Sequence, residues 1–409
     1  MAHEIVDPAL PRTRAAVPES TGRPDSQRLY AAALARILQR ISDHGSATIA
    51  ELVDIAGVSR PTVQRALAEL EQLGVIDQAE LRASGTGRPA RSWVPRTGAR
   101  LVMALDIRRE ESRLVLAGLT GRVVVDEVFG HQALLAEAER SAAGGPPADG
   151  IPELVLRRVA ARLAAAGIAG TDVVEAVIGV SGIVADDGTI LLSTNVPGLT
   201  GYPVGRRAVE LVGLPSVTVE NDMNLRAVGE LHAGIARGLS SFVYLTNHTF
   251  HRPAVVLGGA LWHGHHRTVG EGDQLTRSGV ISPRLTLDGH SVEYFDVAGG
   301  IDSGALDRAW LELLNDQLAK VIAVLCYVLD PEAVLVHGGP VTTGPAAIAD
   351  LQDRFLGYTV TDSAPHLLAA GHGSELTISG ALVLALKQAL GTTLGMPDPP
   401  VPRIHGAPS

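Results

Sequence analysis

Residues 219–230 read VENDMNLRAVGE, and the pattern changes within this stretch from that of a strand to that of a helix. The segment LPSVTVE just before Asn221 is apolar and rich in β-branched residues, as in a buried strand. Asn221 and Asp222 therefore stand where a strand ends. A carboxylate beside an amide at such a position is typical of a catalytic base or of a ligand-binding residue.

Strand-like segments and helices alternate on both sides of this stretch, which predicts an α/β fold. Two strand-like segments around a Leu-Thr-Gly-Arg turn predict a hairpin within 101–130, and a long helix is predicted over 304–328. The strands fall into two groups, before and after about residue 230, so we expect two α/β lobes with a ligand cleft between them. The predicted strand segments are 173–184, 216–220, 240–250, 254–262 and 333–340.

The first hundred residues have a different pattern, which predicts three helices and a hairpin. Helices are expected over 26–43 and 47–56, the second with Thr48 as cap and Glu51 three residues later, as in a capping box. A third helix is expected to begin at Ser59 as cap and to end at Gly74. Two strands around the Gly-rich tip SGTGRP follow. This order is that of a winged helix-turn-helix.

In that fold the third helix enters the major groove, and the wing approaches the DNA backbone. The side chains at the start of the helix suit base edges and phosphates, and Gly85 and Gly87 allow a close approach at the wing. The alternative is a three-helix module that binds protein through a polar face. The residues that we expect to contact DNA are Thr48, Ser59, Arg60, Thr62, Gln64, Arg65, Arg88 and Arg91.

Charge supports the DNA-binding interpretation for the N-terminal part alone. The chain has a net charge of −10, but residues 1–99 carry 12 Arg and no Lys against 11 Asp and Glu, a net charge of +1. Residues 82–96 contain four Arg and no acidic residue. A local basic patch on an acidic protein is suited to phosphate contacts, whereas the acidic remainder argues against a large nucleic-acid surface there.

The 409 residues and 46% hydrophobic content are enough for two or three domains with sizeable cores. We expect no membrane span, because no apolar run approaches the roughly 18–20 residues needed, and no secretory signal at the polar N-terminus. The protein is expected to be cytoplasmic, and the single Cys326 is expected in the core of a helix. The predicted boundaries are a disordered tail over 1–25, a winged helix-turn-helix over 26–98, a two-lobed domain over 99–390 and a frayed C-terminal tail over 391–409.

Five segments in order now carry a resemblance to the ROK family, in its branch with a DNA-binding domain ahead of an actin-like (ribonuclease H-like) sugar-kinase fold. The resemblance covers about residues 26–390. Any one of the segments would be weak, but together they are specific. The segments are VIGVSGIV (177–184), STNVPGL (193–199), VENDMNLRAVGE (219–230), VGEGDQ (269–274) and PEAVLVHGGPV (331–341).

The resemblance implies a sugar-binding set that matches Asn195, Asn221, Asp222, Glu271 and, less securely, Glu293, with Gln274 where the family has a His. Carboxylates and amides are suited to the fixed array of hydroxyls on a pyranose. In the alternative interpretation, Asn195 and Asn221 cap turns and Asp222 caps the following helix. Gln274 and Arg267 indicate an altered sugar preference or an anionic ligand.

The phosphate-binding loops of the family are altered in this chain. The family pattern D-x-G-G-T is replaced by DIRREES at 106–112, and G-T-G-x-G is replaced by HTFHR at 248–252. Side chains with a Cβ prevent the close backbone approach that glycine allows, and Glu110 and Glu111 repel phosphates. Gly338 and Gly339 remain, where a tight strand–helix turn can explain them. We therefore expect Asp222 to recognise a sugar hydroxyl without catalysing phosphorylation, and we expect no cofactor.

The zinc site of many relatives cannot form here, because the chain has a single Cys and has Gln274 in place of the family His. His263, His265 and His266 are an alternative zinc cluster, but adjacent loop histidines more often lie at a polar rim, so no metal is expected.

The sequence thus predicts a sugar-responsive transcriptional regulator, a repressor of carbohydrate uptake or metabolism genes, acting as a homodimer or homotetramer. The alternatives are a diverged sugar kinase with a DNA-binding appendage and a regulator controlled by a protein partner.

Overall fold

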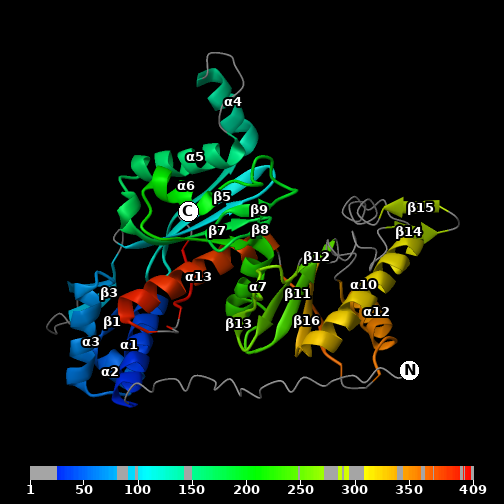
Figure 1. Cartoon of the computed structure of the whole chain (residues 1–409). Helices are drawn as coiled ribbons and strands as arrows, with labels where there is room; N and C mark the ends of the chain where they lie inside the picture. Colours follow the sequence, from blue (N-terminus) through cyan, green and yellow to red (C-terminus); the bar gives the residue numbers. More distant parts are fainter. Residues whose placement is uncertain are drawn as a thin grey trace, which may run out of the picture.

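The computed structural model describes residues 25–80, 91–96, 100–141, 150–246, 249–270, 284–287, 290–293, 308–338, 344–360, 364–371, 373–396, 399 and 401–406. Figure 1 shows a small N-terminal domain beneath a larger α/β part.

The N-terminal domain has the predicted order of elements. Helices α1 (Asp25–His44), α2 (Ile49–Ala56) and α3 (Arg60–Gln72) pack beside a sheet of order β1-β3-β2. Its strands are β1 (Ala47–Thr48), β2 (Ile76–Glu80) and β3 (Arg91–Pro95). The predicted capping box is confirmed. The Thr48 hydroxyl accepts a hydrogen bond from the backbone N–H of Glu51, and the Glu51 carboxylate accepts one from the backbone N–H of Thr48. The architecture is that of a winged helix-turn-helix.

Two five-stranded sheets form the rest of the molecule, one on each side of residue 230 as predicted. The first has the order β10-β7-β4-β5-β6, and the second has the order β13-β12-β11-β16-β17. The strands of the first are β4 (Leu101–Ile107), β5 (Glu111–Gly118), β6 (Val123–Gly130), β7 (Val173–Val180) and β10 (Val217–Asn221). Those of the second are β11 (Phe242–Thr246), β12 (Thr249–Leu257), β13 (Ala260–Leu261), β16 (Ala333–His337) and β17 (His366–Ala369).

Helices cover both sheets and also separate them (Figure 1). The outer face of the first sheet packs on α5 (Ile151–Ala165) and α6 (Val204–Val212), and that of the second on α10 (Arg308–Leu329) and α12 (Pro345–Leu356). Between the sheets lie α7 (Asp222–Ala233) and α13 (Gly373–Leu394). The remaining elements are α4 (His131–Ser141), the 3-10 turn Gly170–Asp172 and the short strands β8 (Ile183–Val184), β9 (Ile190–Leu192), β14 (Arg284–Leu287) and β15 (His290–Glu293).

The alternation of side chains along β4 determines which of its residues face α7 and α13, the helices between the two sheets. Leu101, Met103 and Leu105 belong to the core under α5 and α6, whereas Val102 and Ala104 belong to the core around α13. Side chains alternate between the two faces of a strand. Asp106 therefore points between the lobes, toward the start of α7.

The two central helices cross at glycines. A Cβ at Gly380 of α13 would lie 1.8 Å from the Leu225 carbonyl oxygen, and one at Gly229 of α7 would lie 2.6 Å from that of Leu376. The close approach is possible only without side chains at these two positions.

The α13 helix differs from the expectation that no apolar stretch approaches the length of a membrane span. Among the described residues, 375–394 is the one helix that is long and apolar enough, by length and composition alone, to cross a membrane. More than half of its most apolar window is buried inside the protein. A central helix with neighbours on opposite faces is apolar all round for that reason.

The C-terminal segment is not frayed at residues 401–406, contrary to the prediction. His405 forms a bridge with Arg122 beside the start of β6, and its carbonyl accepts from the Val123 amide at 3.0 Å. Val401 and Ile404 pack on the core shared with α13. Although the segment is rich in proline, its apolar side chains have a groove to fill, and this outweighs the compositional signal.

Candidate DNA-binding face and ligand cleft

The predicted recognition helix α3 presents a polar face to solvent. Its buried side is formed by Val63, Ala66, Leu67 and Leu70, so the helical period turns Gln64 and Arg65 outward. Arg60, Gln64 and Arg65 are exposed and Thr62 is half-buried. The Arg65 guanidinium lies 4.3 Å from the centre of the Tyr30 ring, which holds it against α1.

The two predicted caps differ in their contacts. Thr48 uses its hydroxyl in the capping box of α2. Ser59 occupies the N-cap position of α3 as predicted, but its hydroxyl makes no capping bond to the helix backbone and instead lies 2.9 Å from the Thr62 hydroxyl. If Thr48 or Ser59 binds DNA, its hydroxyl must do so while it keeps the contact described here.

The wing is described only at its base. Arg82, Gly85, Gly87 and Arg88 lie outside the described residues. Arg91 opens β3 and is exposed. Arg96, at the other end of the basic segment, donates to Asp77 at 2.7 Å, so its charge is used within the domain.

Asn221 and Asn195 bind neighbouring protein groups at the entrance to the cleft. The Asn221 oxygen accepts from the Met223 amide at 2.8 Å, which caps α7, and its nitrogen donates to the Gly182 carbonyl at 2.9 Å. Asn195 is exposed and donates to the Ser181 hydroxyl at 2.8 Å. The capping alternative therefore describes Asn221 well.

Asp222 differs from both, because one of its oxygens has no hydrogen-bond partner among the residues that the structure describes. Oδ1 is buried and forms no hydrogen bond with the described residues, whereas Oδ2 lies 3.6 Å from Arg226 Nη2. Asp222 is the first residue of α7 and does not act as its cap. A buried acceptor without a donor is unfavourable by roughly 1–3 kcal/mol, so a ligand hydroxyl would bind there favourably.

A polar cluster beside these residues was missed by sequence reasoning. Glu220 is buried, and its carboxylate receives the Asn224 amide at 2.8 Å and lies 2.6 Å from His263 Nε2. Burial opposes ionisation, but the hydrogen bond and charge of His263 outweigh it and lower the pKa of Glu220. Arg267 reaches Glu220 at 3.7 Å and Asp186 at 3.2 Å, across the lobes. The sequence signal that could have indicated this cluster is Glu220, the acidic residue directly before Asn221 and Asp222.

The histidine cluster thus has a polar role in the structure. His263 binds Glu220, and the His265 and His266 rings contact each other edge-to-face at 4.7 Å. No group of three or more His, Cys, Asp or Glu side chains suited to a metal ion occurs in the described part of the chain.

The described part of the chain does not place the other three predicted ligand residues at the cleft. Glu271 and Gln274 lie outside the described residues. Glu293 ends β15, which pairs with β14 to form a hairpin beside α10 and apart from α7 (Figure 1).

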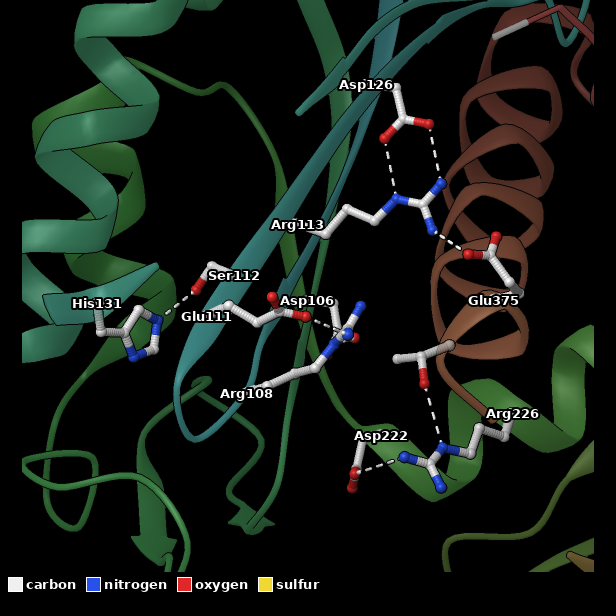
Figure 2. Close-up of polar contacts among 11 residues, drawn as sticks. Asp106, Arg108, Glu111, Ser112, Arg113, Asp126, His131, Asp222, Arg226 and Glu375 are labelled. Atoms are coloured by element: carbon white, nitrogen blue, oxygen red, sulfur yellow. Dashed lines mark hydrogen bonds and ion pairs between the residues drawn. The ribbon is translucent and has the colours of Figure 1, made fainter. Parts of the chain in front are cut away.

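The β4–β5 hairpin, which corresponds to the first phosphate loop, is bridged by its own arginine (Figure 2). Arg108 donates to Asp106 at 2.7 Å and to Glu111 at 2.8 Å. Burial raises the pKa of Asp106 to about 6; Arg108 and Arg226 oppose this shift, whereas the charge of Asp222 adds to it. On the other face of the hairpin, Ser112 lies 2.9 Å from His131 Nε2.

Residues 248–252 replace the second phosphate loop of the family. Strands β11 and β12 are paired as far as Thr246 and Thr249, so residues 247 and 248 connect them. Phe250, His251 and Arg252 belong to strand β12. His248 and Gly339 lie outside the described residues. Gly338 follows β16 directly.

The comparisons with known proteins agree with this architecture. Residues 34–88 match the MarR family, and residues 131–273 match the ROK family. A crystal structure of a ROK family transcriptional regulator, a homolog of the E. coli MLC protein, superposes with a TM-score of 0.57 at 18% identity, over 90% of this chain and 98% of that one. The ROK hexokinase from Thermus thermophilus superposes with a TM-score of 0.50 at 22% identity, over 70% of this chain and 97% of that one.

Curated relatives match parts of the chain. The bifunctional enzyme NanE/NanK of Brucella melitensis is 30% identical over 218 residues, which are 49% of this chain and 41% of that protein. An uncharacterised protein of Clostridium perfringens is 27% identical over 159 residues, 35% of this chain and 54% of that protein. The chain thus spans about half the length of these relatives.

The fold and the matches define a class of protein, a MarR-type winged helix-turn-helix joined to a two-lobed domain with the sugar-kinase fold. Within that class, the chain combines a MarR-type winged helix, matched over residues 34–88, with a ROK domain, matched over residues 131–273.

Proposed function

We infer that this chain is a cytoplasmic transcriptional regulator that binds operator DNA through its winged helix and a sugar or sugar derivative between its lobes. We propose that it represses genes of carbohydrate uptake or metabolism and releases them when the ligand binds. The observation that carries the proposal is an exposed polar face of α3 in a winged helix that is joined to a ROK-type domain, in which Arg108 bridges the β4–β5 hairpin.

The DNA-binding part of the proposal rests on α3 and the wing. Arg60 and Gln64 are exposed at the start of the helix, where they suit base edges in the major groove. The proposed DNA-binding set is Thr48, Ser59, Arg60, Thr62, Gln64, Arg65, Arg88 and Arg91. The structural neighbour that spans both domains is itself a transcriptional regulator, which supports this use of the winged helix.

The ligand-binding part rests on the cleft. The Asp222 oxygen that has no partner among the described residues supports a bound hydroxyl donor, and the likeness to a ROK hexokinase supports a sugar as its source. The proposed ligand set is Asn195, Asn221, Asp222, Glu271 and Gln274, and Glu293 is not part of it because β15 lies beside α10 and apart from α7. Lobe closure around a ligand changes DNA affinity only if the ligand binds the two arrangements unequally.

The absence of kinase activity is also a proposal, and the β4–β5 hairpin supports it. Phosphate-binding loops need backbone amides that phosphate can approach. Here Arg108 crosses the hairpin and Glu111 adds negative charge beside it. A coupled ADP-release assay over a panel of hexoses tests this directly, and turnover above the rate without protein would overturn it.

We propose a homodimer or homotetramer because of an apolar patch on α10 and after α12. Tyr327, Val328 and Val360 are 57%, 75% and 84% exposed, and the Tyr327 hydroxyl accepts from the Val360 amide, which orders the patch. Clustered exposed apolar residues mark interaction sites. A second copy is the occupant that we favour, because winged-helix proteins that read inverted repeats need two DNA-binding domains.

The central experiment is selection of genomic DNA fragments by the purified full-length protein, followed by sequencing. We expect an enriched inverted repeat, whose neighbouring genes name the ligand to titrate. The matched control is the Arg60→Ala/Gln64→Ala double variant, which leaves the domain core intact. Equal recovery by both proteins would remove the DNA-binding assignment and would favour a regulator controlled through a protein partner.

A further inference from the structure

We propose that Arg108 at Asp106 and Arg226 at Asp222 are built-in cations, which together supply the positive charge that a nucleotide-bound divalent metal would bring to these two carboxylates. The inference deepens the proposed function, because it explains how a kinase-like cleft is stable without nucleotide.

The carboxylates of Asp106 and Asp222 lie in the same region, where β4 faces the start of α7, and their charges interact (Figure 2). Asp106 of β4 is opposite Gly179 of β7, and Gly179 is opposite Glu220 of β10, two residues before Asp222. A Cβ at Gly179 would lie 2.8 Å from Leu225 Cδ1, 3.3 Å from Thr377 Cγ2 and 3.7 Å from Asp106 Oδ1, so this glycine lets α7 and α13 pack close beside Asp106. Burial is the main cause that raises the pKa of Asp106, and the charge of Asp222 adds a smaller upward shift.

Arg226 follows Asp222 by one helical turn, which places it on the same side of α7. Its Nη2 lies 3.6 Å from Asp222 Oδ2, and its Nε donates to the Thr377 hydroxyl of α13 at 3.2 Å (Figure 2). The side chains of Asp222 and Arg226 are only 18% and 20% exposed. Arg226 is therefore fixed between the lobes, within reach of the field of both carboxylates.

Arg108 supplies the second positive charge from the opposite direction. It binds Asp106, whose side chain is only 4% exposed, at the tip of the β4–β5 hairpin. Two arginines thus balance the two carboxylates from within the chain, and Glu111 is a third acid at the edge.

Phosphoryl-transfer sites need such balance from a metal ion. Mg²⁺ is held there by one or two carboxylates together with substrate phosphates. The residues of this chain do not suit that arrangement, because guanidinium groups already neutralise the carboxylates and would repel a second cation. The described side chains also provide no group of three metal-ligating residues. Ligand binding at Asp222 should therefore not need a divalent metal.

The test measures thermal unfolding of full-length protein with and without millimolar MgCl₂ or MnCl₂, at matched ionic strength. Wild type should show no metal-dependent shift. Arg226→Met should unfold about 2–4 °C lower, and either metal should restore part of the loss, since it binds the folded state between the freed carboxylates. Isothermal titration with MnCl₂ should then show one site in Arg226→Met alone.

Two further variants keep the result interpretable. Arg226→Lys retains a cation and should show no metal response. If Arg226→Met fails to fold, a folded Arg226→Lys protein would show that the positive charge is what the site needs. Asp222→Asn combined with Arg226→Met should lose the metal response. The matched control is Arg162→Met, which removes a 2.7 Å contact with the single carboxylate of Glu127 and should not be rescued by metal.

A divalent-metal shift in wild type would overturn the inference, and so would an unshifted, metal-insensitive Arg226→Met protein. Failure of the genomic selection would count against the regulator and would leave these metal results unaffected.

Discussion

The arginines of α3 and those of the cleft are one residue type in two opposite settings. Arg60 and Arg65 are exposed on the recognition helix, whereas Arg108 and Arg226 are held by carboxylates and keep 29% and 20% of their side chains exposed. An arginine can bind a partner's phosphate only if the protein has not already paired it. The two regions therefore differ mainly in whether their arginines are free to bind a partner, and less in how many arginines they contain.

The largest expected effect comes from removing a partly buried arginine that binds two carboxylates. Arg113 of β5 binds Asp126 at 2.9 Å and Glu375 of α13 at 2.6 Å, and its side chain is 17% exposed. Arg113→Met should lower the free energy of unfolding by about 3 kcal/mol, because carboxylates lose their partner in a partly buried site. Urea denaturation measures this. Arg206→Met, which breaks an exposed pair with Glu210, is the control and should change little; equal losses would contradict the distinction between paired and available arginines.

The next effect is a pH dependence in the cleft. Asp106 has a pKa of about 6 in the folded protein against 3.8 in the unfolded chain. The folded state therefore binds more protons between these values, and stability should fall as pH rises from about 4 to about 6, by up to roughly 3 kcal/mol. Urea denaturation across this range should show a flatter profile for Asp106→Asn. Parallel profiles for the two proteins would show that Asp106 titrates normally.

The third effect concerns the exposed set. Arg60→Ala should weaken binding to the selected operator by about 10- to 100-fold, since a lost base or phosphate contact is worth about 1–3 kcal/mol. Its thermal unfolding should match that of wild type. Fluorescence anisotropy over a salt series measures the affinity. Unchanged affinity, or a large loss of stability, would place Arg60 among the structural arginines.

The smallest effect is expected at Arg65, which lies between the two classes. It is exposed but stacks on Tyr30 at 4.3 Å. Arg65→Ala should cost about 0.5–1 kcal/mol of stability from the lost cation–π contact, with a few-fold weaker operator binding. Tyr30→Leu should reproduce the loss of stability while retaining the charge. If Arg65→Ala changes neither property, the contact has no energetic weight.

Local sequence rules predicted much of the fold. Thr48 and Glu51 form their capping box because the motif depends on four consecutive residues. The strand end at Asn221 and the division of the strands near residue 230 follow from apolar pattern and turn residues. The altered hairpin at 106–112 was visible as missing glycines, although the pairing of Arg108 with Asp106 was not predicted.

Contacts between distant segments could not be read from the sequence. Glu220 meets His263 and Arg226 meets Thr377 only after the lobes assemble, at separations of 43 and 151 residues. The tail at 401–406 was expected to fray because proline content reports local preference alone, whereas the groove beside β6 is made by other segments.

The core around α13 does not stop at the winged helix. Leu34 and Leu67 belong to the same apolar cluster as Leu386 and Leu390, the Ser42 hydroxyl donates to the Thr120 carbonyl at 2.5 Å, and Arg100 donates to Thr393. The two domains therefore share one continuous core, and we expect them to unfold together rather than as separate modules. A fragment cut at residue 98 would leave apolar surface uncovered on both pieces, so recombination of this DNA-binding domain with another sensor requires a matching α13.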